Sequence, residues 1–495
     1  MKKKQIYEAK VTDRVDFQDK AKVCVINAPE AEDNGTMITV KHAIPGQKIE
    51  FRLKRQGKGD LVQVLERSPL ETEETCSVFG RCGGCGYISM DYDAQLKMKL
   101  DMVRRLFGAE DGKIRPGFPG EILHSPLKKR YRNKMEYSFG DMEKGGKMTL
   151  GLHRRGSRYD VVNVTDCLLV HDDCNKIAAA VQDFFAEKKV PYYHKMTGEG
   201  YLRHLVLRRS EATGELLLNL VTTSSSCFYN AAEESPKTTA GMHKGGCVKS
   251  LLAAFTEKVL SIPIEGKIAG MIHTVNDSIA DVVKDEGTSL LYGRDHITED
   301  LLGLKFKITP FSFFQTNSNG AEVLYSKVRE YALSGMTDTF TEKEKPVIFD
   351  LYSGTGTIAQ VMAPVAKKVY GVEIVEEAVE AARINAGLNG LDNCEFIAGD
   401  VLKCIDWIEE NPDFIILDPP RDGVHPKALD KILAYGVPNI LYISCKPTSL
   451  VRDLQKFEEA GYTLERSCCV DMFPGTGHVE TVALISSSKG DHQKS

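Results

Sequence analysis

The sequence predicts an α/β protein in three parts: a small β-barrel over residues 1–66, an α+β central domain over 67–310, and a doubly wound, Rossmann-like domain over 311–495. Two observations predict the last part. Apolar strand segments alternate with helical segments from residue 345 to 487, and a glycine-rich turn at 350–357 joins the first strand to the first helix. Such alternation is typical of a parallel sheet that binds its ligand at the carboxyl ends of the strands.

The elements of the C-terminal domain follow one another in a regular order. Strands are expected at 347–351, 368–372, 394–397, 414–417 and 439–444. Helices are expected over about 357–363 and 375–388, and Asn389-Gly390 stops the second one.

The two preceding parts have different patterns. Residues 1–66 contain short alternating or β-branched runs separated by turns such as Asn34-Gly35, which predicts a small barrel that binds nucleic acid or acts as a spacer. The central domain begins with a cysteine cluster and a helix from about 91 to 107, followed by mixed strands and helices. Residues 222–248 are rich in Ser, Thr, Lys and Gly, and we expect an exposed insertion there.

Composition narrows the class of protein. The 495 residues are 42% hydrophobic and 27% charged, which is ordinary for a globular protein. The net charge of -5 argues mildly against RNA binding, although only a contact face needs to be positive. Thirteen cysteines in a long chain suit a reducing compartment, and no apolar run reaches the roughly 18 residues that span a bilayer. We therefore expect a cytoplasmic monomer with no membrane partner.

The glycine-rich turn and two acidic residues predict an adenosine ligand. Glycines at 354 and 356 let the backbone approach a ligand closely, and we count Thr357 among the binding residues. Glu373 ends the second strand, where a carboxylate can accept both ribose hydroxyls, and Asp400 follows the third strand, beside the adenine edge. A dinucleotide enzyme is the alternative. It prefers a third glycine where Ala359 stands, but Ala is tolerated there.

Three residues at the same sheet edge predict the chemistry. Asp418 follows the strand at 414–417, Cys445 follows the strand at 439–444, and Glu480 begins a late strand. A thiol, a methyl donor and a carboxylate together suit methylation of uracil at carbon 5. A thiolate that adds to carbon 6 makes carbon 5 nucleophilic, and a base must then remove the carbon 5 proton before the thiol can leave. We predict Cys445 as nucleophile and Glu480 as base.

Other residues near this site have a choice of roles. His478 either tunes Glu480 or caps a loop. Cys468 and Cys469 lie in a predicted strand and are expected in the core.

A second group of cysteines predicts a metal site. Cys76, Cys82 and Cys85 are spaced Cys-x5-Cys-x2-Cys with glycines between the last two, and a fourth ligand must come from elsewhere. Four thiolates suit zinc and a four-iron cluster equally by count.

Basic runs in the central region predict an RNA-binding face. They lie at 128–134, 153–155 with Arg158, 203–204 and 208–209. Such runs can bind phosphates while aromatic rings stack on unpaired bases, although many charged runs are simply solvated surface. The target uracil must leave its stack to reach Cys445, so base flipping is required.

Together these motifs resemble the RNA uracil-5-methyltransferase family over nearly the whole chain, and most closely its iron–sulfur branch, which modifies 23S ribosomal RNA. The matching residues are Cys76, Cys82, Cys85, Cys167, Phe-Phe-Gln-Thr-Asn at 313–317, Asp-Pro-Pro-Arg at 418–421, Ser-Cys-Lys-Pro at 444–447 and His-Val-Glu-Thr at 478–481.

The resemblance implies a role for individual residues. Gln315, Tyr352, Glu373 and Asp418 would contact S-adenosylmethionine, Cys445 and Glu480 would be nucleophile and base, and Phe313 would line the target-base pocket. The four cysteines would hold a structural [4Fe-4S] cluster, with Cys167 preferred to its near competitor Cys174. The barrel would be a TRAM- or OB-like RNA-binding domain.

The chain departs from the family pattern at two places. Lys446 stands where Asn is common after the nucleophile, and a cation there could lower the thiol pKa. The insertion at 222–248 is longer than usual.

Three alternatives stay open at this point: the same reaction on a transfer RNA uridine, an RNA-binding iron–sulfur protein with a degenerate site, and an amino-group methyltransferase suggested by Asp418-Pro419-Pro420. The last needs no thiol.

Overall fold

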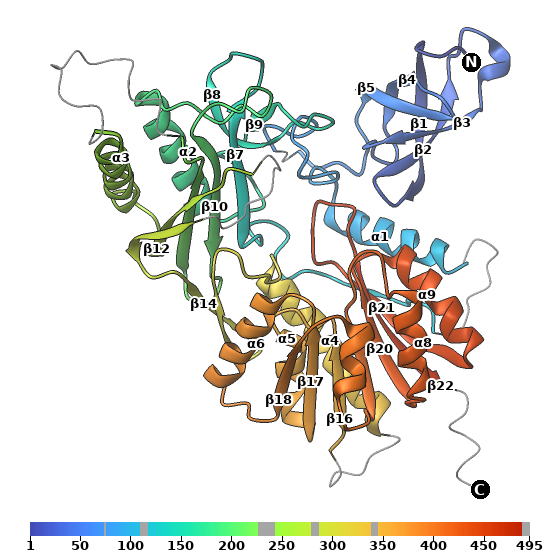
Figure 1. The fold of residues 1–495 in the computed structure, drawn as a ribbon. Coiled ribbons are helices and arrows are strands. Elements are labelled where there is room, and N and C mark those ends of the chain that lie inside the picture. Colours follow the sequence, from blue (N-terminus) through green and yellow to red (C-terminus); the bar gives the residue numbers. More distant parts are fainter. Residues whose placement is uncertain (74–75, 109–116, 226–242, 279–286, 338–344, 488–495) are drawn as a thin grey trace, which may run out of the picture.

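A computed structural model describes residues 1–73, 76–108, 117–225, 243–278, 287–337 and 345–487 (Figure 1). None of its described helices is long and apolar enough to cross a membrane.

The N-terminal part is a closed five-stranded barrel with the strand order β1-β2-β3-β5-β4. Its strands are β1 (Ile6–Asp16), β2 (Lys20–Ile26), β3 (Met37–Lys41), β4 (Lys48–Leu53) and β5 (Lys58–Glu66). Alternate residues of β2, namely Ala21, Val23 and Val25, point inward and are at most 1% exposed. This period of two fills the barrel with apolar side chains and confirms the predicted barrel.

The central part is a seven-stranded sheet with the order β13-β12-β11-β10-β7-β8-β9. Its strands are β7 (Lys134–Asp141), β8 (Met148–His153), β9 (Val161–Asn163), β10 (Leu202–Arg209), β11 (Glu215–Thr222), β12 (Lys267–Val275) and β13 (Thr288–Gly293). Helices α2 (Asp172–Glu187) and α3 (His243–Leu260) pack on it over a shared apolar core (Figure 1). Most of the predicted insertion, 226–242, lies outside the described residues. The last part of the predicted insertion is helical, because α3 begins at His243.

The C-terminal part is an eight-stranded sheet with the order β18-β17-β16-β19-β20-β22-β21-β6. Its strands are β16 (Val347–Leu351), β17 (Lys368–Glu373), β18 (Cys394–Ala398), β19 (Phe414–Leu417), β20 (Asn439–Ser444), β21 (Tyr462–Val470), β22 (Glu480–Ser487) and β6 (Ile122–Leu123). Its helices are α4 (Ser318–Thr337), α5 (Thr357–Met362), α6 (Glu376–Leu388), α7 (Val401–Cys404), α8 (Pro426–Ala434) and α9 (Pro447–Glu459).

The first five strands of this sheet are parallel. The chain winds outward in one direction from β16 through β17 to β18, and in the other from β19 to β20. The doubly wound prediction is therefore confirmed, and the switch point between β16 and β19 is where such a sheet opens a crevice for a ligand.

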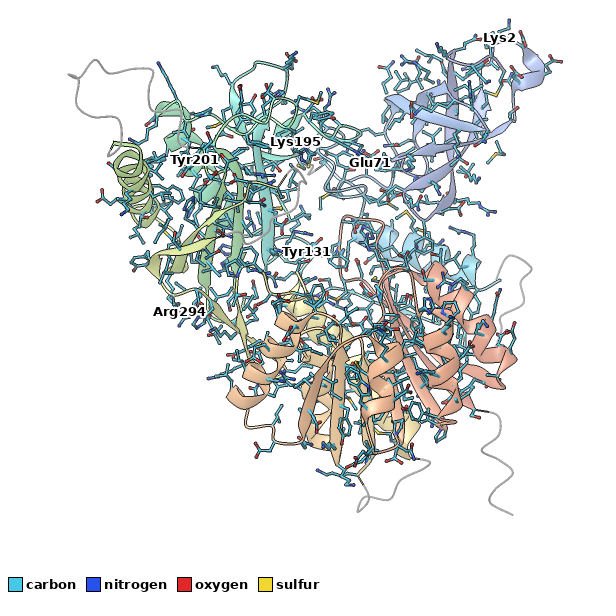
Figure 2. The ribbon with its side chains drawn as sticks, in the orientation of Figure 1. Lys2, Glu71, Tyr131, Lys195, Tyr201 and Arg294 are labelled. Carbon is cyan, nitrogen blue, oxygen red and sulfur yellow. The ribbon has the colours of Figure 1, made fainter. Side chains whose placement is uncertain are left out.

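The predicted domain boundaries do not follow the packing. Helix α1 (Tyr92–Leu106) and strand β6 were expected in the central domain. Instead β6 pairs with β21, and α1 packs beside α9. The hairpin of β14 (Ile297–Leu301) and β15 (Leu304–Ile308) also joins the core of the C-terminal sheet. Figure 2 shows Tyr131 at the junction of the two parts. The local pattern predicts helix α1, but it does not show which sheet the helix covers.

Candidate active site

A cavity of about 1060 Å³ lies at the carboxyl ends of the parallel strands. All eight residues predicted to bind the ligand or to act in catalysis line it: Gln315, Tyr352, Thr357, Glu373, Asp400, Asp418, Cys445 and Glu480. The carboxyl ends of parallel strands meet at one edge of a sheet, so residues up to 165 positions apart converge there. The structure thus brings the predicted site together.

The glycine-rich turn forms one wall of the cavity. Gly356 has a φ of 71°, and a Cβ atom there would lie 2.5 Å from Phe396 Cε1, so only glycine fits. The Gly354 N–H donates to Glu373 Oε2 at 3.0 Å, and the Val375 N–H donates to Glu373 Oε1 at 3.0 Å. These two bonds fix the Glu373 carboxylate at the tip of β17. Each oxygen keeps a second lone pair for a ribose hydroxyl.

Asp400 lies at the end of the third strand and also starts a helix. Its Oδ1 accepts from the Leu402 N–H at 3.0 Å, which caps α7 and fixes the side chain. The predicted adenine-edge position is therefore held rigidly at the cavity wall.

Three carboxyl groups have raised pKa values at this edge of the sheet, and two of them, Asp418 and Glu480, line the cavity. Burial raises the pKa of Asp350 to about 8, and the charge of Asp418 adds to the effect. Burial, and then Glu373, raise the pKa of Asp418 to about 7. Burial, and then Asp418, raise the pKa of Glu480 to about 8, against the opposing charge of Arg421. Buried carboxyl groups that repel one another suit a ligand with positive charge.

The thiol of Cys445 faces these acids. Burial raises its pKa to about 11, and Glu480 and Asp418 add to the effect. Arg421 opposes them through its charge and a hydrogen bond to the thiol. No role was predicted for Arg421, although it follows Asp418-Pro419-Pro420 on the same sheet edge.

The structure does not support the role suggested for Lys446, which was to lower the pKa of the Cys445 thiol. Its Nζ lies 3.9 Å from Asp422 Oδ1, and the two influences that lower the Cys445 pKa both come from Arg421.

The segment that carries Gln315 is held from two sides. The Asn133 side chain donates to the Gln315 carbonyl at 2.9 Å, and the Asn133 N–H donates to the Thr316 carbonyl at 2.9 Å. Asn317, fully buried, donates to Ser125 Oγ at 3.1 Å and to the Met472 carbonyl at 2.9 Å. Phe313 stays 65% exposed beside the cavity, as a base-contacting ring would be. Asn133 lies far away in sequence, within the basic run 128–134, and that run does not predict its contact with the segment of Gln315.

The structure bears on the roles predicted for His478, Cys468 and Cys469. The pKa of Glu480 is set by burial, Asp418 and Arg421, which gives tuning by His478 no support. The His478 ring instead lies 6.2 Å from the Phe473 ring, edge to face. Cys468 and Cys469 are fully buried, which confirms them as core residues.

Part of the predicted RNA face is wrong. Arg203, His204, Arg208 and Arg209 are all at most 9% exposed. Arg208 donates from Nε to the Pro310 carbonyl at 3.3 Å and also bonds the Ser312 carbonyl, and its burial lowers its pKa to about 10. These bonds stabilise the segment before Phe313. A run of basic residues does not reveal that strand β10 is buried on both of its faces.

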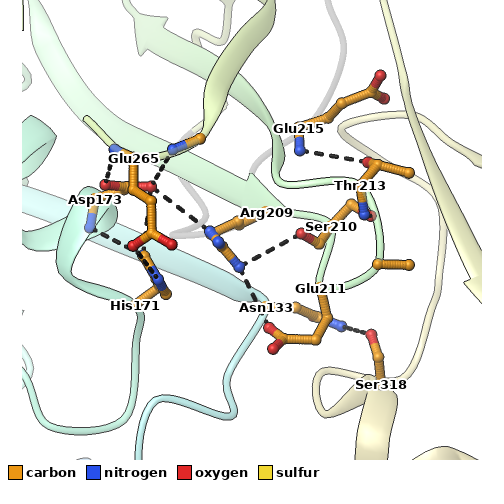
Figure 3. Close-up of polar contacts among 12 residues, drawn as sticks. Asn133, His171, Asp173, Arg209, Ser210, Glu211, Thr213, Glu215, Glu265 and Ser318 are labelled. Carbon is orange, nitrogen blue, oxygen red and sulfur yellow. Dashed lines mark hydrogen bonds and ion pairs between the residues drawn. The ribbon is translucent and has the colours of Figure 1, made fainter. Parts of the chain in front are cut away.

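Arg209 makes a similar internal network, drawn in Figure 3. Its Nε lies 3.7 Å from Asp173 Oδ2, and its Nη1 lies 3.3 Å from Glu211 Oε2. The exposed cations of the predicted face are Lys128, Arg130, Arg154 and Arg158.

Among the four cysteines predicted to hold the cluster, the other three raise the pKa of Cys85. Burial raises the pKa of Cys85, and Cys167, Cys82 and Cys76 raise it further. The Gly84 N–H donates to Cys82 Sγ at 3.3 Å. Cys174, the competitor for the fourth place, is 2% exposed within the central core.

In the part of the chain that the structure describes, no three His, Cys, Asp or Glu side chains are arranged to hold a metal ion.

Comparisons with protein families and with known relatives point to RNA methyltransferases. The family model for tRNA (Uracil-5-)-methyltransferase matches residues 276–488. A relative in Clostridium tetani, named as an RNA methyltransferase, is 46% identical over 456 residues, which cover 91% of this chain and 93% of the relative. A Bacillus cereus relative of the same name is 31% identical and covers 92% of this chain and 93% of its own length.

A solved structure covers almost the whole molecule. The tRNA (uracil-54, C5)-methyltransferase of Pyrococcus abyssi, in complex with S-adenosyl-L-homocysteine, superposes with a TM-score of 0.70 at 25% identity, over 96% of this chain and 99% of that chain. The acidic cavity at the switch point and these similarities agree, and the chain belongs to the S-adenosylmethionine-dependent RNA (uracil-5-)-methyltransferase family.

Proposed function

We propose that the chain methylates carbon 5 of a specific uridine in RNA, with Cys445 as nucleophile and Glu480 as base. One observation carries the proposal: a thiol, a buried carboxyl group and a guanidinium meet in the same cavity as the residues suited to an adenosine ligand.

The residues at the glycine-rich turn suit S-adenosylmethionine. Glu373 would hold the ribose and Asp400 the adenine edge, while Gln315, Tyr352, Thr357 and Asp418 line the remaining wall. When bound, the donor supplies an electrophilic methyl group on a positively charged sulfur. Asp418 and Glu480, which line the cavity, provide the acidic surroundings that accept such a charge.

Cys445 would begin the reaction. With a pKa of about 11, its thiol must lose its proton to water before attack, and the Arg421 guanidinium would stabilise the thiolate. The Cys445 Sγ–carbon 6 bond then forms while the carbon 5–carbon 6 double bond opens. Carbon 5 becomes the nucleophile that takes the methyl group, and the donor's sulfur would keep the electron pair of the broken sulfur–methyl bond and leave as a neutral thioether.

Glu480 would complete it. A carboxyl group with a pKa of about 8 is well suited to removing a proton near neutral pH. As the carbon 5–hydrogen bond breaks, its electron pair restores the double bond, and Cys445 leaves as a thiolate. The proton ends on Glu480.

Two kinds of RNA are candidate substrates. The cysteine set favours a looped uridine of 23S ribosomal RNA, through the resemblance to the iron–sulfur branch. The description of the matching family and the name of the Pyrococcus abyssi enzyme favour a transfer RNA uridine as the second candidate. In either case the barrel and the exposed cations near Lys128 and Arg154 would bind RNA, and the enzyme would act as a cytoplasmic monomer.

Cys76, Cys82, Cys85 and Cys167 would hold a [4Fe-4S] cluster. Each thiolate of such a cluster binds a different iron, so the four can interact without sharing one ion, and N–H bonds to sulfur such as that of Gly84 are typical of these sites. The cluster would tie the cysteine segment to the central domain. Anaerobic purification followed by iron and zinc analysis tests this proposal, which predicts about four irons per chain and no zinc.

Nucleoside analysis tests the proposed function. The protein is incubated with donor and with 23S ribosomal or transfer RNA from cells that lack the chain, and 5-methyluridine is measured. Cys445→Ala should abolish the product, whereas Cys24→Ala, which changes a partly exposed cysteine of the barrel, should leave it unchanged. Methylation of uracil by Cys445→Ala would overturn the mechanism, and methylation of an amino group would overturn the reaction class.

A further inference from the structure

The loop between β21 and β22, residues 471–479, ends at the proposed base. Glu480 is the first residue of β22, and Phe473 within the loop lines the catalytic cavity. Backbone and side-chain groups from several separate parts of the chain hold this loop, so its conformation depends on how those parts are assembled.

Helix α1 holds the start of the loop. The Lys99 Nζ donates to Asp471 Oδ1 at 2.6 Å and to the Phe473 carbonyl at 3.1 Å, and the side chains of Lys99 and Asp471 are fully buried. Gln95, one turn earlier on the helix, accepts from the Gly475 N–H at 2.8 Å.

The cysteine segment and the central domain hold the middle. The N–H groups of Gly86 and Tyr87 both donate to the Gly475 carbonyl, at 3.1 and 2.8 Å. Tyr131 donates from its hydroxyl to the Pro474 carbonyl at 3.0 Å.

The barrel holds the end of the loop, through Asp19 in the turn between β1 and β2. A Cβ atom on Gly477 would lie 2.4 Å from Asp19 Oδ1, so the carboxylate packs directly on that glycine. His42 lies 3.3 Å from Asp19 Oδ2. Burial raises the pKa of Asp19, but His42 and the charge of His478 outweigh it and hold the pKa below its usual value.

We propose that Asp19 is a positioning residue for the catalytic base: it packs on Gly477, and so fixes the last turn before Glu480. This inference rests on the proposed function. It makes the barrel part of the machinery of one step, in addition to any contact it makes with RNA.

The step concerned is the second one. Glu480 breaks the carbon 5–hydrogen bond, the electron pair re-forms the double bond, and the carbon 6–sulfur bond breaks to release Cys445. A displaced Glu480 slows this elimination but not the attack by Cys445, which follows a different strand, β20. The expected signature is therefore an accumulated covalent protein–RNA adduct that carries the methyl group.

Asp19→Asn in the full chain is the main variant. Asp19 has a φ of 55°, which Asn tolerates, so the change removes the charge without straining the turn. Asp13→Asn, which changes an exposed acid of strand β1 in the same barrel, is the matched control. Single-turnover reactions with donor and substrate RNA are quenched in denaturant, and the adduct and free 5-methyluridine are measured separately.

We expect the release of 5-methyluridine to slow by about tenfold, with a matching rise of adduct, while the rate of adduct formation and the KM for RNA stay within about twofold. Gly477→Ala, which places a methyl group against Asp19, should give the same signature. Equal slowing of formation and release in both variants, or no slowing in either, would overturn the inference. Absence of adduct and product in the unaltered protein would instead count against the proposed function.

Discussion

Glu480 shows how burial sets the behaviour of a single carboxyl group. Its pKa is raised to about 8, as are those of Asp350, to about 8, and Asp418, to about 7. Between the ordinary carboxyl values and these raised ones, the folded protein binds more protons than the unfolded chain. The stabilisation is therefore fully present below the ordinary values and is lost as pH rises through about 7 to 8.

The melting temperature of the free protein should accordingly fall between about pH 6 and about pH 9. Glu480→Gln removes one of the three titrations, so its melting temperature should fall less over the same range. Thermal unfolding followed by circular dichroism measures both, with Glu395→Gln, at a surface ion pair with Lys368, as the control. Parallel curves for Glu480→Gln and the unaltered protein would contradict the assignment.

Arg421 should govern the reactivity of Cys445. Arg421→Gln removes the charge and the hydrogen bond that lower the thiol pKa. The midpoint for alkylation of Cys445 by iodoacetamide should then move to higher pH by about one unit. Alkylation of Cys24 in the same samples is the internal reference. An unchanged Cys445 midpoint would show that Arg421 does not act on the thiol.

At the scale of elements, the glycine-rich turn is where the sequence is most informative. Gly356→Ala should cost about 1–2 kcal/mol for the left-handed backbone and about 1–3 kcal/mol more for the contact with Phe396. It should also weaken donor binding. Gly390→Ala is the matched control, because its φ is 63° and no atom lies within 4 Å of the new Cβ. Urea unfolding and calorimetric titration with donor compare them. Equal losses would contradict the packing argument.

The elements also show why some sequence predictions succeed. Apolar runs that end at Gly354, Asp418 and Cys445 predict parallel strands, and the geometry of a parallel sheet then gathers those residues at one edge. Arg208 fails for the opposite reason. A basic residue in a strand predicts a solvated face. Whether its side chain points toward solvent or toward a neighbouring segment such as 310–312 depends on the rest of the sheet.

At the scale of the molecule, the Lys99–Asp471 ion pair joins segments 372 residues apart. Lys99→Met leaves Asp471 buried without its partner and should lower the free energy of unfolding by about 3–5 kcal/mol, and adding Asp471→Asn should recover much of the loss. Lys97→Met on the same helix breaks an exposed pair with Asp101 and should cost less than about 1 kcal/mol. Equal costs for the two single variants in urea unfolding would contradict the role of burial.

Contacts between distant segments of the molecule could not be predicted from the sequence. Asp19, Lys99 and Asn133 reach the catalytic region from three separate segments, and none belongs to a local motif. Strand β6 joins the C-terminal sheet through two residues, too few to carry a period. Such contacts depend on the whole assembly.

The central claim is that Cys445 bonds covalently to the uracil that receives the methyl group. Mass spectrometry of Glu480→Gln after reaction with donor and substrate RNA tests it most directly. The account predicts a methylated uridine nucleotide attached to the peptide that contains Cys445, and no such species in Cys445→Ala. Attachment at another residue, or release of 5-methyluridine by Cys445→Ala, would contradict it.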